Sequence, residues 1–194
     1  MKTFKSLLVT LVVVFFSQLL YAQQDYTGLY MTYNDFLQKK LSYPVECGSK
    51  NGKLRLNELF GSSKGFVIQN GEKHEFDKKR VYGYRTCANK NYRFYNNSSY
   101  EILDTAGFYI YYQYRLEQKV KGKGAIKTDE YFFSRYAGDP ILALTADNLK
   151  KAFPANHMFH HELDAQFRSD KDLMAYDSYA KNYKVKCLYN DSLK

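Results

Sequence analysis

Two histidines and an aspartate near the C-terminus have the spacing of a metal site on one face of a helix. His157, His161 and Asp164 are separated by four and then three residues, so an α-helix would place them on the same side. Two imidazoles with a carboxylate one turn further on could hold a zinc or copper ion. The alternative is an exposed helix face on which Asp164 forms a salt bridge with Arg168. Because a two-histidine pattern is weak, we prefer the alternative and expect no cofactor.

Two further matches to catalytic motifs do not predict an enzyme. Residues 61–65 read GSSKG and fit G-x-S-x-G, but a strand-like run follows the serine where a nucleophile elbow requires a helix. Residues 161–165 begin like H-E-x-x-H, but Ala165 stands where the second histidine must be. We therefore expect a protein that is not an enzyme. A small secreted hydrolase with a site that the sequence does not reveal stays open as an alternative.

Tyrosine is the most unusual part of the composition, with 20 Tyr and 14 Phe among 194 residues and no Trp. In one strand-like run, Tyr109, Tyr111 and Arg115 alternate onto the same face. The two tyrosines could form an aromatic platform for a sugar ring or a peptide, and Lys121 and Lys123 add positive charge in the turn that follows. The alternative is a purely structural role, because tyrosine is favoured in strands and charged turns are common.

The first residues have the pattern of a secretory signal peptide. Lys2 and Lys5 precede an uncharged apolar stretch at residues 7–20, and Ala22 is a small residue before Gln23, where the chain turns polar. The stretch is shorter than the roughly 20 apolar residues that span a bilayer, so an uncleaved anchor is the less favoured alternative. Cleavage between Ala22 and Gln23 would leave 172 of the 194 residues, lower the net charge from +9 to +7, and leave no transmembrane segment.

Three cysteines remain after such a cleavage. An oxidising compartment would permit one disulfide and leave one thiol over. We favour pairing Cys47 with Cys87, because both lie in the strand-rich half of the chain and Cys187 does not. Three unpaired cysteines are the alternative.

The elements that would position these residues begin with a strand-rich part. Residues 26–41 predict a short helix, with Thr32 as its N-cap. Residues 43–133 contain short strand-like runs separated by turn signals, among them an Asn70-Gly71 pair typical of a type I′ hairpin. These runs predict an antiparallel β-meander, either a sheet or a partly open barrel.

Residues 145–184 predict a helical part. Thr145 and Asn156 are candidate N-caps for two helices, and Ser169 followed by Asp172 resembles a capping box for a third. The third helix would carry on one face Leu173, Tyr176, Ala180 and Tyr183. Each helix has a single apolar stripe, so it must pack on another element, most simply the sheet. With a signal peptide at 1–22, we expect residues 23–194 to form one α+β domain.

Three segments resemble uncharacterised exported proteins of Bacteroidota-type bacteria, in the same order along the chain. These are residues 28–36, residues 81–86, which read VYGYRT, and residues 144–179. In that group the middle motif often reads tryptophan-glycine-tyrosine, and Tyr82 replaces the tryptophan here. The resemblance implies an exported protein of unknown function, and it supplies no catalytic residue.

The charge narrows the expected partners. Of the net charge of +9, residues 23–144 carry +6 and residues 145–194 carry +1. A basic, aromatic surface could bind nucleic acid, but export to the periplasm, the outer surface or the medium argues against that partner. We expect a non-catalytic envelope or secreted protein that binds a glycan, a peptide or an envelope protein. A structural subunit of an outer-membrane assembly is a further alternative, and the oligomeric state stays open.

Overall fold

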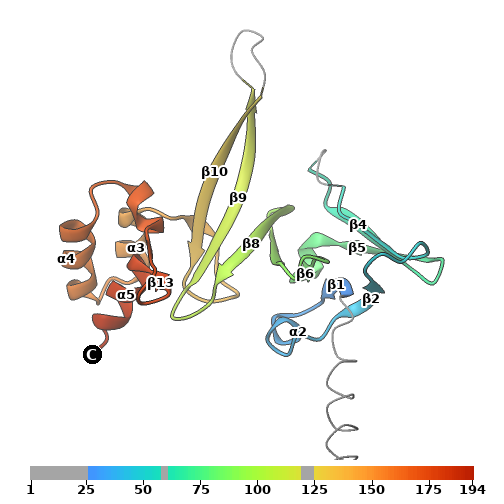
Figure 1. The fold of residues 1–194 in the computed structure, drawn as a ribbon, viewed down its shortest axis with the longest axis horizontal. Helices are drawn as coiled ribbons and strands as arrows, with labels where there is room; N and C mark the ends of the chain where they lie inside the picture. The colour runs from blue at the N-terminus through green and yellow to red at the C-terminus, as the bar shows by residue number, and fades with distance from the viewer. Residues whose placement is uncertain (1–25, 58–60, 119–124) are drawn as a thin grey trace, which may run out of the picture.

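The chain folds around one large antiparallel sheet. The computed structural model describes residues 26–57, 61–118 and 125–194. In the order in which they lie side by side, the eight strands of this sheet are β11 (Leu142–Ala143), β10 (Ala125–Ser134), β9 (Tyr109–Gln118), β8 (Ser98–Asp104), β7 (Asn91–Tyr95), β6 (Gly83–Arg85), β1 (Tyr26–Tyr30) and β2 (Ser42–Glu46). The predicted α+β class with an antiparallel meander is confirmed, and the sheet is open (Figure 1).

The meander runs without interruption from β6 to β11, and the β1–β2 hairpin extends it because β1 pairs with β6. The longest pairing joins β9 to β10 over ten residue pairs, from Tyr109 opposite Ser134 to Gln118 opposite Ala125. This hairpin projects away from the body of the molecule (Figure 1).

A second sheet consists of β3 (Lys53–Arg55), β4 (Lys64–Gln69) and β5 (Glu72–Asp77). Asn70 and Gly71 connect the last two strands with φ angles of 53° and 84°. Both angles are positive, as the type I′ turn requires, so the predicted hairpin is confirmed. Because β4 begins directly after Ser63, the serine motif at 61–65 leads into a strand and forms no nucleophile elbow.

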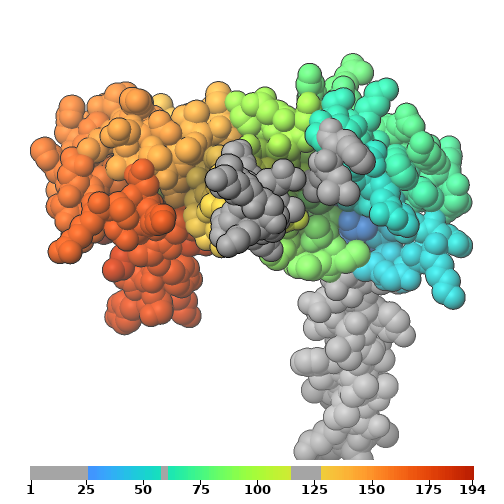
Figure 2. Space-filling view, turned by 90° about the horizontal axis from the view of Figure 1, so that it is seen from above, coloured from blue at the N-terminus to red at the C-terminus, as the bar shows by residue number. Residues whose placement is uncertain are grey.

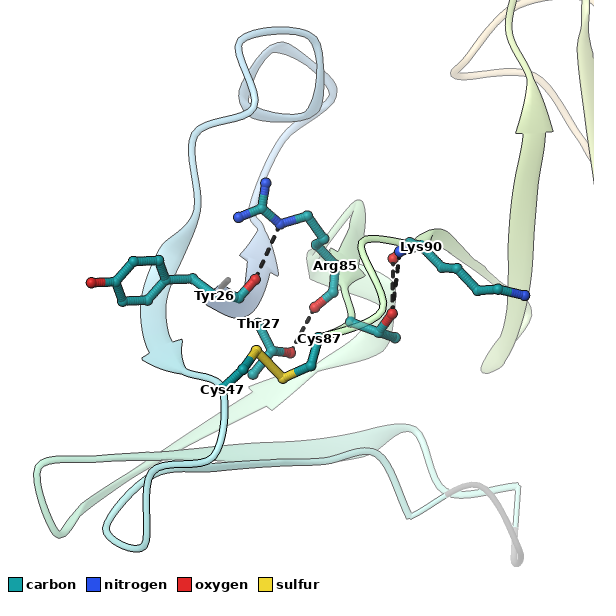
Figure 3. Close-up of a disulfide and its surroundings, with 7 residues drawn as sticks. Tyr26, Thr27, Cys47, Arg85, Cys87 and Lys90 are labelled. Atoms are coloured by element: carbon teal, nitrogen blue, oxygen red, sulfur yellow. Dashed lines mark hydrogen bonds between the residues drawn. A yellow bond between two sulfur atoms is a disulfide. The ribbon is translucent and has the colours of Figure 1, made fainter. Parts of the chain in front are cut away.

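The Cys47–Cys87 disulfide fixes the end of β2 to the loop that follows β6, with a Cα–Cα separation of 5.6 Å (Figure 3). The favoured pairing is therefore the one found, and Cys187 is free. Beside the disulfide, Thr27 Oγ1 donates to the Arg85 carbonyl at 2.6 Å, and Arg85 Nε donates to the Tyr26 carbonyl at 3.1 Å. These bonds hold β1 against β6 at the point where the cross-link closes.

The predicted N-terminal helix exists but is shorter than 26–41. It is α2 (Tyr33–Leu37), and Thr32 and Asp35 form its capping box. The preceding residues form β1 instead of helix, because they pair with β2 on one side and β6 on the other. Pairing with segments distant in sequence overrides the local helical signal.

The C-terminal part confirms two of the three predicted helices. Thr145 caps α3 (Ala146–Ala152) and Asn156 caps α4 (His157–Gln166) through side-chain bonds to backbone N–H groups. Ser169 and Asp172 form the expected capping box, but it begins the short 3-10 helix η3 (Asp170–Met174).

The prediction of a third long helix directly after Ser169 is wrong. After η3 the chain forms the two-residue strands β12 (Tyr176–Asp177) and β13 (Asn182–Tyr183), and only then α5 (Lys184–Asp191). The Asp177 carboxylate accepts bonds from the N–H groups of Tyr179 and Ala180, and Lys181 has a φ of 51°. A side chain that satisfies its own neighbouring backbone in this way favours a turn over a helix.

The sheet is covered at its two ends by different layers. The helices bury Phe108, Ile110 and Phe133 of the β9–β10 region, whereas the three-stranded sheet packs on Leu29 and Tyr84. These layers lie at opposite ends of the molecule (Figures 1 and 2). None of the helices in the described part of the chain is long and apolar enough to cross a bilayer. The predicted cleavage between Ala22 and Gln23 lies outside the described residues.

Candidate functional site

The prediction that Tyr109 and Tyr111 form an exposed aromatic platform is wrong. Both side chains are buried, at 7% and 0% exposed, in a cluster with Ala137 and Ile141. Rings of α2 and the loop after β10 cover this face, so the tyrosines form core. The covering residues come from segments far away in the sequence. Strand alternation does not reveal that these segments cover this face. Of the other residues predicted here, Arg115 lies in β9, and Lys121 and Lys123 lie outside the described residues.

The predicted metal residues do not form a metal site. Within the ranges that the structure describes, no three side chains of His, Cys, Asp or Glu come together closely enough to hold an ion. Asp164 instead pairs with Lys150 of α3, with Nζ and Oδ1 2.5 Å apart, and the ion pairs found among the described residues do not include the expected bridge to Arg168. The ring of His157 lies against that of His160, at 5.8 Å between centroids. Packing of α3 beside α4 therefore determines the partner of Asp164.

A pocket of about 430 Å³ lies beside the end of β7. It lies where four segments meet: the residues around Thr32, the short 3-10 helix η2 (Lys78–Arg80), the β7–β8 turn and the loop after β10. The cationic residues that line it are Lys78, Lys79, Arg80 and Arg93. Its aromatic and amide lining consists of Tyr33, Tyr82, Phe94, Tyr95, Asn96 and Asn97. None of its described lining residues is acidic.

Arg93 is the most deeply placed of these cations, with only 5% of the residue exposed. Its Nη1 donates to the Tyr111 hydroxyl at 3.0 Å, and its Nη2 donates to the Asp139 carbonyl at 2.8 Å. The rings of Tyr82, Tyr95 and Tyr111 lie 5.7 to 5.9 Å from its guanidinium carbon. No carboxylate among the described residues forms an ion pair with it. Within the described part of the chain, the guanidinium is thus held by neutral acceptors and ring faces.

Lys78 is the second buried cation of the pocket and is 2% exposed. Its Nζ donates to the Asn97 carbonyl at 3.2 Å and lies 5.9 Å from the centre of the Phe94 ring. Lys79 and Arg80 follow it at the surface. The lining of the pocket therefore contains two buried cations and two exposed ones.

Local sequence explains how η2 is held. The Asp77 carboxylate accepts a bond from the Lys79 N–H at 2.9 Å, which caps η2, and the Lys78 N–H donates to the Ser63 carbonyl at 2.7 Å. A side-chain oxygen one position before a helix satisfies one of its unpaired N–H groups. The backbone under the cations is therefore fixed independently of the cationic side chains.

The β7–β8 turn forms another wall. Asn96 and Asn97 have φ angles of 48° and 64°, a conformation that asparagine tolerates better than most residues. The Oδ1 atom of Asn97 is buried and has no hydrogen-bond partner among the described residues. A buried acceptor without a donor costs about 1–3 kcal/mol, so this turn is held at some cost in stability.

The tyrosines keep the base of the pocket neutral. Burial raises the pKa of Tyr82 far above its usual value, in spite of the opposing effect of Arg93. Burial, together with the hydrogen bond between its hydroxyl and that of Tyr33, likewise raises the pKa of Tyr109. The hydroxyl groups of Tyr33 and Tyr109 lie 2.8 Å apart. Neither Tyr82 nor Tyr109 supplies a negative charge to balance Arg93 near neutral pH.

Sequence reasoning missed Lys78 and Arg93. In β7, Tyr92 and Phe94 point to one face, so alternation assigns Arg93 to the other face, where a charged residue suggests solvent. The only available signal was an arginine within a run of aromatic residues, which is too common to indicate a site. Its burial depends on α2 and the loop after β10.

No family model, no curated protein and no solved structure matches this chain. The interpretation of the pocket therefore depends on its own residues and geometry.

Proposed function

We propose that this chain is an exported, non-catalytic protein that binds an anionic glycan, peptide or protein partner in the pocket above Arg93. One observation carries the proposal: four cations line the pocket, and none of its described lining residues is acidic.

The energetics of burial support an anionic ligand. Removing an ion from water costs several kcal/mol unless opposite charge or hydrogen bonds compensate. Among the described residues, two hydroxyl groups, one carbonyl and three rings compensate for the buried charge of Arg93. A ligand carboxylate or other oxyanion would add the opposite charge, and arginine binds such groups through paired N–H donors.

The lining gives less support to the alternative of a small secreted hydrolase. General acid–base and nucleophilic catalysis rely mainly on His, Asp, Glu, Cys, Ser or Lys with a suitable neighbour. The described lining includes no His, Asp, Glu, Cys or Ser, and Lys78 contacts a carbonyl and a ring. Binding is therefore the better supported function.

Export rests on the signal-peptide pattern and agrees with the disulfide between Cys47 and Cys87. Structural disulfides persist in oxidising compartments and are rare in the cytosol. Fractionation of the producing cell would test this part, and recovery of the uncleaved chain in the cytosol would contradict it.

Two double variants test the binding site. Lys79→Ala/Arg80→Ala removes the two rim cations, whereas Lys151→Ala/Lys171→Ala removes two exposed cations from the helical part. Both change the net charge equally. We expect the purified protein to bind heparin or polyglutamate at low salt, and only the first variant to lose at least tenfold in affinity. Equal affinities of the two variants, or no binding to either polymer, would overturn the proposal.

A further inference from the structure

We propose that two copies of this chain form a weak dimer by antiparallel pairing of their β5 strands. The surface involved is the outer edge of the three-stranded sheet, and none of the residues of β5 lines the pocket described above. The inference is therefore independent of the proposed function. It follows from the open backbone of this edge, from the exposure of its side chains and from the order of its charges.

The two edges of the large sheet are protected against such pairing. In β2, Pro44 has no N–H group to donate, and its carbonyl accepts a bond from Gln69 Nε2 at 2.8 Å. At the other edge, β11 is only two residues long, and the Ala143 carbonyl accepts a bond from Asn148 Nδ2 at 3.0 Å. Proline and short edge strands are common devices that prevent sheets from pairing edge to edge.

The edge of β5 has neither device, and it is six residues long. Gln69 and Glu72 flank a two-residue turn and exchange hydrogen bonds, so every second residue after Glu72 bonds to β4. The backbone groups of Lys73 and Glu75 therefore point away from β4. Within the described part of the chain, no hydrogen bond of these groups is found. The side chains of Lys73 and Glu75 are 53% and 60% exposed, so a second strand can approach this edge.

The order of the charges along β5 is self-complementary. Lys73 and Glu75 lie on the same face of the strand, with Nζ and Oε1 2.7 Å apart. An antiparallel pair centred on His74 places Lys73 of one copy opposite Glu75 of the second copy, and the two-fold axis repeats this contact. Each charge then keeps its opposite neighbour along the strand and gains another across the interface. Opposite charges that face each other across antiparallel strands are favourable.

The same charges select the register of the pair. Sliding one strand by two residues in either direction would place Lys73 opposite its own copy or Glu75 opposite its own copy. Like charges in these positions are destabilising, and charged edges usually prevent association for this reason. The register centred on His74 avoids both conflicts, and in it Lys73 and Glu75 exchange backbone hydrogen bonds across the interface. Because so short a strand pair buries little surface, the dimer should be weak and depend on concentration.

Sedimentation equilibrium of the purified protein at low salt, from micromolar to millimolar concentration, tests the proposal. We expect the average mass of the wild-type protein to rise toward twice that of one chain. Lys73→Glu and Glu75→Lys should each remain monomeric, because each places like charges opposite one another. Lys53→Glu is the control: it makes the same charge change at an exposed position of β3, the other edge of this sheet, and should dimerise as the wild type does.

Mixing the two monomeric variants gives the sharper result. An equimolar mixture of Lys73→Glu and Glu75→Lys should dimerise, because one chain supplies two carboxylates and the other two ammonium groups. Amide hydrogen exchange reports on the backbone: at millimolar concentration the Lys73 and Glu75 amides should exchange at least threefold more slowly than at micromolar concentration. The His74 amide, which bonds to β4, should not change.

Three results would overturn the inference. A wild-type protein that stays monomeric at millimolar concentration would exclude the dimer. A dimer that persists in Lys73→Glu and in Glu75→Lys would place the interface on another surface. A mixture of these two variants that stays monomeric would exclude the register centred on His74.

Discussion

Arg93 and Tyr111 lie on strands that are not neighbours, yet the arginine Nη1 donates to the tyrosine hydroxyl at 3.0 Å across β8. The same hydroxyl lies 2.9 Å from Ser134 Oγ, which donates to the Tyr136 carbonyl at 2.7 Å. This series of bonds connects the cation at the base of the pocket to β9, β10 and the loop that covers the sheet. The position of the proposed binding group therefore depends on the centre of the fold.

Removing the Tyr111 hydroxyl tests this connection. Tyr111→Phe leaves a buried guanidinium with one acceptor fewer, so we expect the free energy of unfolding to fall by about 1–3 kcal/mol. Chemical denaturation measures this change. Tyr179→Phe is the control, because Tyr179 is 97% exposed, and it should change stability by less than about 0.5 kcal/mol. Equal stability of wild type and Tyr111→Phe would show that the bond contributes nothing.

A further buried cation, Lys186, anchors the C-terminal helix α5. Lys186 is 0% exposed, and its Nζ lies 2.7 Å from Asp104 Oδ1 and donates to the carbonyls of Ala106 and Phe108. Asp104→Asn keeps the oxygen and removes the charge. Because the variant leaves the ammonium without its counter-ion, we expect the free energy of unfolding at pH 7 to fall by about 3 kcal/mol.

This loss should shrink as the pH rises. Burial lowers the pKa of Lys186, and the hydrogen bond and charge of Asp104 oppose that effect. Asp104→Asn removes the opposition, so the folded variant releases the proton at a lower pH than the folded wild type. Above that pH the unfolded state binds more protons than the folded state, and stability rises with pH. Melting curves of both proteins between pH 7 and 10 measure the difference, and a gap that widens would contradict the account.

The disulfide should be a major source of stability. Cys47 and Cys87 are 40 residues apart, and a loop of that size corresponds to about 4 kcal/mol in the chain-entropy model. We expect Cys47→Ser/Cys87→Ser to lose about this amount in urea denaturation. Cys187→Ser, which removes the free thiol, is the control. In reducing agent, the wild-type protein should be as stable as the double variant is without reducing agent. Insensitivity to reductant would contradict the cross-link.

Tyr112 should titrate abnormally in spite of its place near solvent. Its hydroxyl donates to Asp129 Oδ1 at 2.7 Å, and this hydrogen bond, with smaller effects of burial and of the Asp129 charge, raises the pKa of Tyr112 to about 12. In Asp129→Asn the phenol pKa should fall toward 10.0. Ultraviolet titration of the tyrosinate band, with Tyr112→Phe to assign the signal, measures it. An unchanged titration curve would exclude the bond.

Local signals in the sequence were reliable where a feature depends on adjacent residues. The caps at Thr32, Thr145 and Asn156 and the Asn70-Gly71 turn all depend on nearby backbone, and the structure contains each of them. The third long helix failed because the side chain of Asp177 competes for the backbone N–H groups.

The candidate site was not predictable from the sequence. Its cations come from η2 and β7, and the layer that buries Arg93 comes from α2 and the loop after β10. Strand alternation assigns residues to a face but does not say which face a distant segment will cover. The same segments bury Tyr109 and Tyr111, which alternation had suggested would form an exposed platform.

The most direct test of the pocket is a nuclear magnetic resonance titration of the isotopically labelled protein with heparin or polyglutamate at low salt. The account predicts that the largest shift changes occur at pocket residues, above all at Lys79, Arg80 and the Arg93 guanidinium. Shift changes centred on residues outside the pocket, or none at millimolar ligand, would contradict it.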